Sequence, residues 1–157
     1  MNLFFINDKN EIFYRPDTTL NKECPVYYVP DSIRSIEYAP FIYVKIDRAG
    51  KYIAPRFAPR YYSKTGQGLA IFGYESEKRD EMLANLLDNS TIVCELTPIE
   101  SISDQALIDK IDQAISTISE KTSLKTGDYV CLCSSIRTPT EIGETVKISE
   151  ERSLLIK

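Results

Sequence analysis

Five short stretches in the first half of the chain are rich in aromatic and β-branched residues and are separated by turn formers. This pattern is typical of β-strands, in which successive side chains point to opposite faces of a sheet. The stretches that we expect to form strands are residues 3–6, 11–14, 26–29, 41–46 and 69–72.

Two glycine-containing segments lie among these stretches. Residues 47–50 predict a hairpin in which Gly50 takes a positive φ, because glycine adopts that conformation without steric cost. The hairpin would lead into a strand at 51–53. The second segment, Thr-Gly-Gln-Gly at 65–68, precedes the apolar stretch 69–72.

Two segments instead show the apolar period of a helix. Residues 76–87 place leucine and methionine side chains on one face and charged residues in the first turns. The second segment repeats isoleucine, leucine and alanine at helical spacing as far as Ile118, and Ser103 or Asp104 is a suitable N-cap for it. We expect this second apolar stripe to be part of the core.

Further strands are expected at 129–133, after a turn at 125–128, and around Val146 and Leu155. Many strands with two helices indicate an α+β protein with a largely antiparallel or mixed sheet. No repeat or linker divides the sequence, so residues 1–157 are interpreted as one domain.

Charge and hydropathy narrow the function. The chain carries 19 basic and 23 acidic residues, a net charge of −4. Because the basic residues are dispersed along the sequence, we expect neither nucleic acid nor a membrane surface as partner. No apolar run approaches the ~20 residues of a transmembrane helix, and the first residues lack the features of a signal peptide. A cytoplasmic location is therefore expected.

The chain has no histidine and four cysteines, which form no Cys-x-x-Cys pair. The absence of histidine removes the usual proton shuttle and the usual activator of a nucleophile. Free cysteine packs as a small hydrophobe, so we expect buried, reduced thiols; a redox pair at Cys131 and Cys133 is the alternative. The other two cysteines are Cys24 and Cys94.

Motifs in a fixed order along the chain resemble the fumarylacetoacetate hydrolase family. Phe-Tyr-Arg-Pro-Asp-Thr-Thr-Leu at 13–20 resembles the family's Phe-x-Lys-Pro-x-Ser/Thr-x-Leu. Glu-Tyr-Ala-Pro-Phe-Ile at 37–42 resembles its His-Tyr-Glu-x-Glu-Leu, and Leu-Lys-Thr-Gly-Asp at 124–128 resembles its Leu-x-x-Gly-Asp turn. The resemblance implies a β-roll of mixed sheets with two helices, and a homodimer.

The same resemblance implies a site for magnesium, manganese or calcium, which prefer several oxygen ligands. The family's two glutamates fall on Ala39 and Phe41, and its third carboxylate on Ala70. Its lysine before the Phe-Asp segment falls on Asn85. None of these positions keeps the family's charge, so we expect the metal site to be lost and no cofactor to be bound.

Two hypotheses follow. In the first, the protein is a catalytically inactive relative with a binding or assembly role, as a homodimer or in a hetero-oligomer with an active relative. In the second, it is a divergent hydrolase, decarboxylase or isomerase of small 2-oxo acids that uses Mg²⁺ and a rebuilt site. The residues suggested for that site are Arg15, Glu37, Glu75 and Asp88.

Arg15 and Asp88 are also the candidate ligand-binding residues of the first hypothesis. Arg15 keeps the positive charge of the family's lysine before proline and is suited to a carboxylate; the alternative is a surface arginine packed along a strand. Arg137 and Thr138 belong either to a remnant pocket or to a solvated loop.

Overall fold

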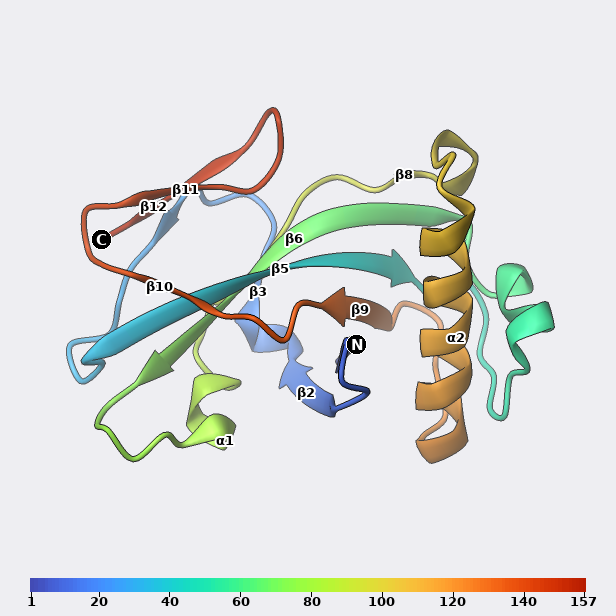
Figure 1. The fold of residues 1–157 in the computed structure, drawn as a ribbon, viewed down its shortest axis with the longest axis horizontal. Helices are drawn as coiled ribbons and strands as arrows, with labels where there is room; N and C mark the ends of the chain where they lie inside the picture. Colours follow the sequence, from blue (N-terminus) through green and yellow to red (C-terminus); the bar gives the residue numbers. More distant parts are fainter.

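A computed structural model describes all residues from 1 to 157. Its centre is a curled mixed sheet of nine strands (Figure 1). The strands are β1 (Asn2–Asn7), β2 (Ile12–Pro16), β3 (Leu20–Asn21), β5 (Ser35–Lys45), β6 (Lys64–Tyr74), β7 (Thr91–Val93), β8 (Thr97–Pro98), β9 (Tyr129–Cys133) and β10 (Thr138–Thr140). They follow the order β2-β1-β9-β5-β6-β7-β3, with β10 paired to β5 and β8 paired to β6.

A second sheet and a few helices flank this centre. The small sheet has the order β11-β12-β4. None of the helices is long and apolar enough to cross a membrane. The flanking elements are β4 (Val26–Tyr27), β11 (Thr145–Lys147), β12 (Ser153–Ile156), α1 (Glu81–Ala84), α2 (Gln105–Lys121) and the 3-10 helices η1 (Asp17–Thr19), η2 (Pro55–Arg60) and η3 (Ile99–Ser101).

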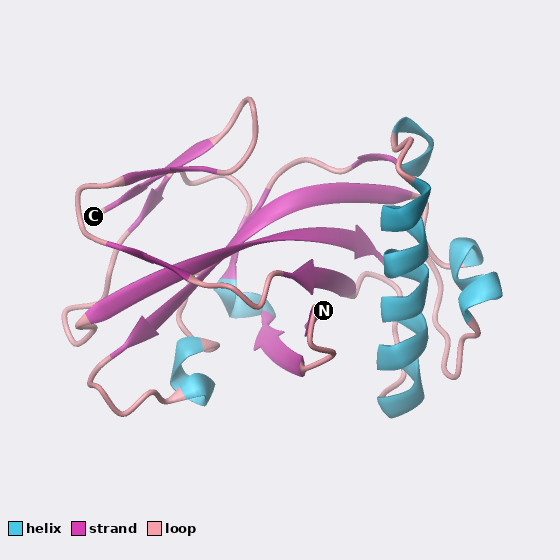
Figure 2. Ribbon diagram, in the orientation of Figure 1, coloured by secondary structure: helices cyan, strands magenta, loops and turns pink.

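The antiparallel pair β5–β6 runs through the whole molecule, and each strand has 11 residues. Alternating side chains of the pair point to opposite faces. The inner face joins an aromatic core cluster, whereas the outer face is covered by α2 at one end and by the small sheet at the other (Figure 2). The inner cluster includes Leu3, Phe5, Ala39, Phe41, Tyr43, Ala70, Phe72, Tyr74 and Tyr129.

Pro40 lies in the middle of β5, although a proline there favours an edge or irregular strand. The structure shows why it is tolerated. Beside Pro40 the neighbouring strand changes, because β10 pairs with β5 as far as Tyr38 and β9 begins to pair at Phe41. The missing N–H of Pro40 therefore falls at the junction, while its carbonyl accepts a hydrogen bond from Ser134.

The long helix and the strand at 129–133 confirm the sequence predictions, and Asp104 caps α2 by accepting from the Leu107 N–H. The hairpin prediction at 47–50 is wrong. Residues 51–53 form no strand, the positive φ is at Tyr52 rather than Gly50, and Gly50 instead bridges to Leu124. The helix predicted over 76–87 is reduced to α1.

Gly68 provides a test of this arrangement. It lies opposite Phe41 in the β5–β6 register, and a Cβ at this position would meet both the Phe41 ring and the Ile92 carbonyl oxygen. We expect Gly68→Ala to lower the free energy of unfolding by about 1–3 kcal/mol through overpacking, and the melting temperature by about 2–10 °C. Differential scanning calorimetry measures both.

A second substitution checks the cause. Phe41→Leu in the Gly68→Ala background removes the ring and should restore part of the loss, while the Ile92 contact remains. An unchanged melting temperature in Gly68→Ala alone would contradict the packing described.

Candidate functional site

A polar cavity of about 470 Å³ lies against the curled sheet. Its walls come from the β1–β2 turn, from β5 and β6, from the segment around α1, and from the connection between β9 and β10. The lining residues are Asn7, Lys9, Glu11, Ile12, Phe13, Glu37, Phe72, Arg79, Glu81, Asn85, Cys133, Ser134, Ser135 and Arg137.

Two arginine–glutamate pairs meet on one phenol in this wall. Arg79 donates to both oxygens of Glu37, at 2.6 and 2.9 Å, and Arg137 donates to Glu81 at 2.9 Å. Both arginines also donate to the Tyr74 hydroxyl. Tyr74 in turn donates its single proton to Glu81 at 3.0 Å. The network joins four charges from three separate segments of the chain.

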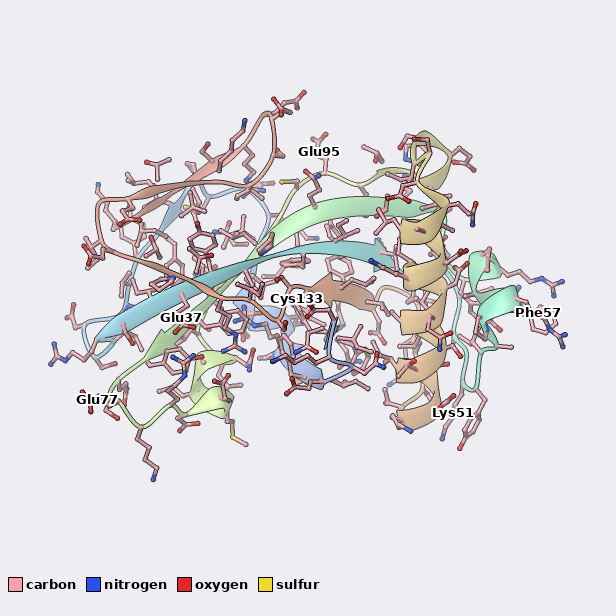
Figure 3. The ribbon with its side chains drawn as sticks, viewed as in Figure 1. Glu37, Lys51, Phe57, Glu77, Glu95 and Cys133 are labelled. Atoms are coloured by element: carbon pink, nitrogen blue, oxygen red, sulfur yellow. The ribbon has the colours of Figure 1, made fainter.

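Strand pairing and a short helix position these groups. Glu37 on β5 lies opposite Phe72 on β6. Asp80 caps α1 by accepting from the Leu83 N–H, which holds the segment between Arg79 and Asn85. Arg137 directly precedes β10, which pairs with the first half of β5. Figure 3 shows Glu37 and Cys133 near the middle of the molecule, away from the outer side of α2.

The pKa values of three groups in the wall are shifted away from neutral pH. The hydrogen bond from Arg79 lowers the pKa of Glu37 below its usual value of 4.5. Burial raises the pKa of Tyr74 to about 12 and the pKa of the Cys133 thiol to about 11. At neutral pH Glu37 is therefore charged, whereas the phenol and the thiol are neutral.

Arg15 lies behind this wall and is fully buried. Its Nε donates to Asn85 at 2.9 Å, its Nη1 to Thr91 at 2.9 Å and to the Ser90 carbonyl at 3.0 Å, and its Nη2 to the Ile71 carbonyl at 2.5 Å. The guanidinium carbon also lies 4.6 Å from the centre of the Phe72 ring.

No carboxylate contacts the Arg15 guanidinium. Burial lowers its pKa to about 10, which leaves it charged at neutral pH. Arg15 is therefore neither the surface arginine considered from sequence nor a lining residue of the cavity. Because all three of its nitrogens donate to protein acceptors, Arg15 is better suited to hold Asn85 and Phe72 in place than to bind a ligand directly.

Of the other positions named from sequence, Asn85 lines the cavity and Asp88 does not. The Asn85 amide links two groups, because its oxygen accepts from Arg15 and its nitrogen donates to the Glu81 carbonyl at 2.8 Å. Asp88 is exposed outside the cavity. Sequence reasoning named Glu37 only as part of a rebuilt site and did not identify Arg79, Glu81 or Tyr74.

The three positions predicted to replace metal ligands lie together on the inner face of the sheet. Ala39 is directly opposite Ala70, and Phe41 follows on the same face of β5. All three are buried in the aromatic core, where the Phe41 and Phe5 ring centres are 5.0 Å apart. These side chains present carbon only, and nowhere in the structure do three or more His, Cys, Asp or Glu residues gather. The residues present do not fit a hard divalent cation.

All four cysteines are free thiols. Cys131 and Cys133 are buried, as expected, and Cys94 is partly buried. The prediction is wrong for Cys24, which is exposed in the loop after β3.

Known proteins match this chain in fold but not in sequence. No family model and no curated protein matches the sequence. The fold does match solved structures, among them a fumarylpyruvate hydrolase from Pseudomonas aeruginosa in complex with Mn²⁺ and pyruvate. The TM-score is 0.82 at 13% identity, over 99% of this chain and 89% of that chain.

Two further solved structures also match in fold at low sequence identity. A maleylpyruvate hydrolase from Sphingobium sp. SYK-6 gives a TM-score of 0.78 at 14% identity, over 99% of this chain and 70% of the other. A 5-carboxymethyl-2-hydroxymuconate delta-isomerase from Mycobacterium smegmatis gives 0.76 at 12%, over 99% and 79%. The protein therefore has the fold of the fumarylacetoacetate hydrolase family, which confirms the fold class expected from the resemblance.

Arg15 allows a direct test of its positioning role. Arg15→Met removes hydrogen bonds to four buried acceptors, at about 1 kcal/mol or more each, so we expect a loss of about 3 kcal/mol or more in unfolding free energy. Chemical denaturation followed by circular dichroism measures it. Arg15→Lys keeps the charge with fewer donors and should lie between Met and the parent. Equal stability of Arg15→Met and the parent would contradict the role.

The Glu37–Arg79 pair predicts a pH effect. Because the folded-state pKa of Glu37 is lowered, the pair stabilises the fold above the unfolded-state pKa near 4.5, and that stabilisation is lost as the pH falls through the folded-state value. Melting temperatures from about pH 6 to pH 3 should fall less steeply for Glu37→Gln than for the parent. Glu23→Gln, an exposed glutamate without an ion pair, is the control and should follow the parent.

Proposed function

We propose that the protein binds small carboxylates in the polar cavity without a divalent cation and does not catalyse a reaction there. The observation that carries the proposal is the state of Arg137. Only its Nη1 is engaged by the protein, with Glu81 and Tyr74, so its Nε and Nη2 remain free. These two nitrogens form one edge of the guanidinium, and such an edge binds a carboxylate through two parallel hydrogen bonds.

The setting of Arg137 supports this role. Its guanidinium carbon lies 3.8 Å from the centre of the Phe72 ring, and the side chain is only 22% exposed. Stacking fixes the plane of the guanidinium, so that little further ordering is needed when an anion binds.

The charge balance of the cavity also favours an anion. The wall carries three basic and three acidic side chains, and Arg15 adds a buried positive charge behind Phe72 without a carboxylate partner. The wall charges are Lys9, Arg79, Arg137, Glu11, Glu37 and Glu81.

The ionisation of the wall argues for binding rather than catalysis. General acids and bases are most effective when their pKa lies near the working pH. The pKa values of Tyr74, Cys133 and Glu37 are all shifted away from neutrality, and the chain has no histidine. The apolar residues at positions 39, 41 and 70 add to this argument.

One observation favours a second function. The structures that share the fold include hydrolases and an isomerase, and one of them was solved with Mn²⁺ and pyruvate. A divergent enzyme for small 2-oxo acids is therefore the alternative. Assembly with a second copy of the chain or with an active relative stays a prediction of the resemblance.

Ligand titrations in the presence of EDTA test the proposal. Pyruvate, oxaloacetate and fumarate are added while the melting temperature is followed. A ligand at a hundredfold its Kd adds about 2.7 kcal/mol, or about 5–10 °C for a chain of this size. We expect a saturable shift with at least one of these acids in the parent protein and its loss in Arg137→Gln. Arg60→Gln removes the same charge far from the cavity and should keep the shift.

The alternatives give different results. A shift that requires Mg²⁺ or Mn²⁺, or consumption of oxaloacetate or an acylpyruvate, would support the enzyme and contradict the binding role. No shift with any acid, with or without metal, would contradict both.

A further inference from the structure

The connection between β5 and β6 has a charge unlike that of the rest of the chain. Residues 45–64 contain six basic residues and a single acid, Asp47, whereas the remaining residues contain 13 basic and 22 acidic ones. Asp47 accepts a hydrogen bond from Ser63 at 2.8 Å. The connection is therefore a local basic region on an acidic protein.

Its cations are stacked on aromatic rings. The guanidinium carbons of Arg56 and Arg60 lie 4.7 and 4.8 Å from the centre of the Phe57 ring, and that of Arg48 lies 5.3 Å from the Tyr61 ring. We call Arg48, Arg56, Phe57 and Arg60 the basic–aromatic surface.

The arginines of this surface have free donors. No side-chain nitrogen of Arg48, Arg56 or Arg60 makes an ion pair or a hydrogen bond within the protein, whereas Arg15, Arg79, Arg137 and Arg152 all do. The three arginines and Phe57 are exposed. The surface therefore presents three oriented, unneutralised guanidinium groups to a partner.

The backbone beneath the surface is firmly held. Ala58, Ile53 and Tyr62 are buried in the core cluster under α2. The Tyr62 hydroxyl donates to Asp112 at 2.8 Å, and the Ile53 N–H donates to the Ser119 hydroxyl at 3.0 Å. Such pre-ordering reduces the entropy lost on binding. Figure 3 shows Phe57 and Lys51 beyond α2, on the side away from Glu37 and Cys133 of the cavity.

We propose that the basic–aromatic surface is a docking site for an acidic segment of a partner protein. Arginine and aromatic residues are enriched where protein interfaces concentrate their binding energy. Guanidinium edges pair with the carboxylates of Asp and Glu through two hydrogen bonds. The partner segment should therefore present at least two carboxylates to the guanidinium groups that stack on the Phe57 ring.

Two other polyanions fit less well. A nucleic acid would meet repulsion from the rest of the chain, which has 13 basic and 22 acidic residues. The isoelectric point of the whole chain is about 5.0, whereas domains that bind nucleic acids are typically basic overall. In addition, the Phe57 ring is already occupied by Arg56 and Arg60, which leaves little of it for stacking on a base. A membrane surface would need a larger apolar face than Phe57 provides.

Fluorescence anisotropy with a fluorescein-labelled peptide of about ten glutamates tests the proposal. We expect saturable binding that weakens as salt is raised, and a loss of about tenfold or more in affinity for the double variant Arg56→Gln/Arg60→Gln. Lys22→Gln/Lys157→Gln removes the same charge beside the small sheet, away from η2 (Figure 1), and should change the affinity by less than about twofold. Melting curves of both double variants verify that they are folded, as expected for exposed residues.

Several outcomes would overturn the proposal. They are the absence of peptide binding, an equal loss in the two double variants, and tighter binding of single-stranded oligothymidine or of phosphatidylserine vesicles than of the peptide. The test does not depend on the carboxylate site, because the residues that it changes lie outside the cavity.

Discussion

The Arg15 guanidinium lies in the interior without a carboxylate, so the dipoles around it must stabilise its charge. Those dipoles come from separate parts of the chain: Asn85 after α1, Ser90 and Thr91 at the start of β7, and Ile71 on β6. An unpaired buried charge is costly unless it is fully hydrogen-bonded. This requirement fixes β2, β6, β7 and the α1 segment relative to one another, and with them the back wall of the cavity.

The cavity depends on that constraint through Phe72. Its ring contacts the buried Arg15 and also the partly buried Arg137, so the orientation of the Arg137 guanidinium follows from the position of Arg15. Arg79 and Tyr74 complete the wall by satisfying Glu37 and Glu81. One edge of Arg137 is left free, and this makes the network a candidate binding site rather than a closed structural cluster.

Local sequence patterns correctly predicted the elements that are determined by their own residues. The apolar period of α2, its Asp104 cap and the apolar run Tyr-Val-Cys-Leu-Cys of β9 are such cases. Strand β5 begins at Ser35, whereas the sequence predicted a start at 41 because Pro40 interrupts the strand pattern. Only the junction of β9 and β10 beside Pro40 shows why the proline is tolerated. The cavity was less predictable, since Arg79 and Arg137 meet only when β10 pairs with β5. The charged run around Arg79 resembled the first turn of a helix.

The apolar residues on the inner face bear on whether this face needs a cation for stability. Carboxylates held together on one face repel one another unless a cation lies between them, so a fold that keeps such a cluster is more stable with its metal bound. With Ala39, Phe41 and Ala70 the same face packs as core, and Phe41 fills the space above Gly68. The inner face at these positions is therefore filled by apolar side chains, and the charged side chains of the cavity, Arg137 among them, lie beside this core.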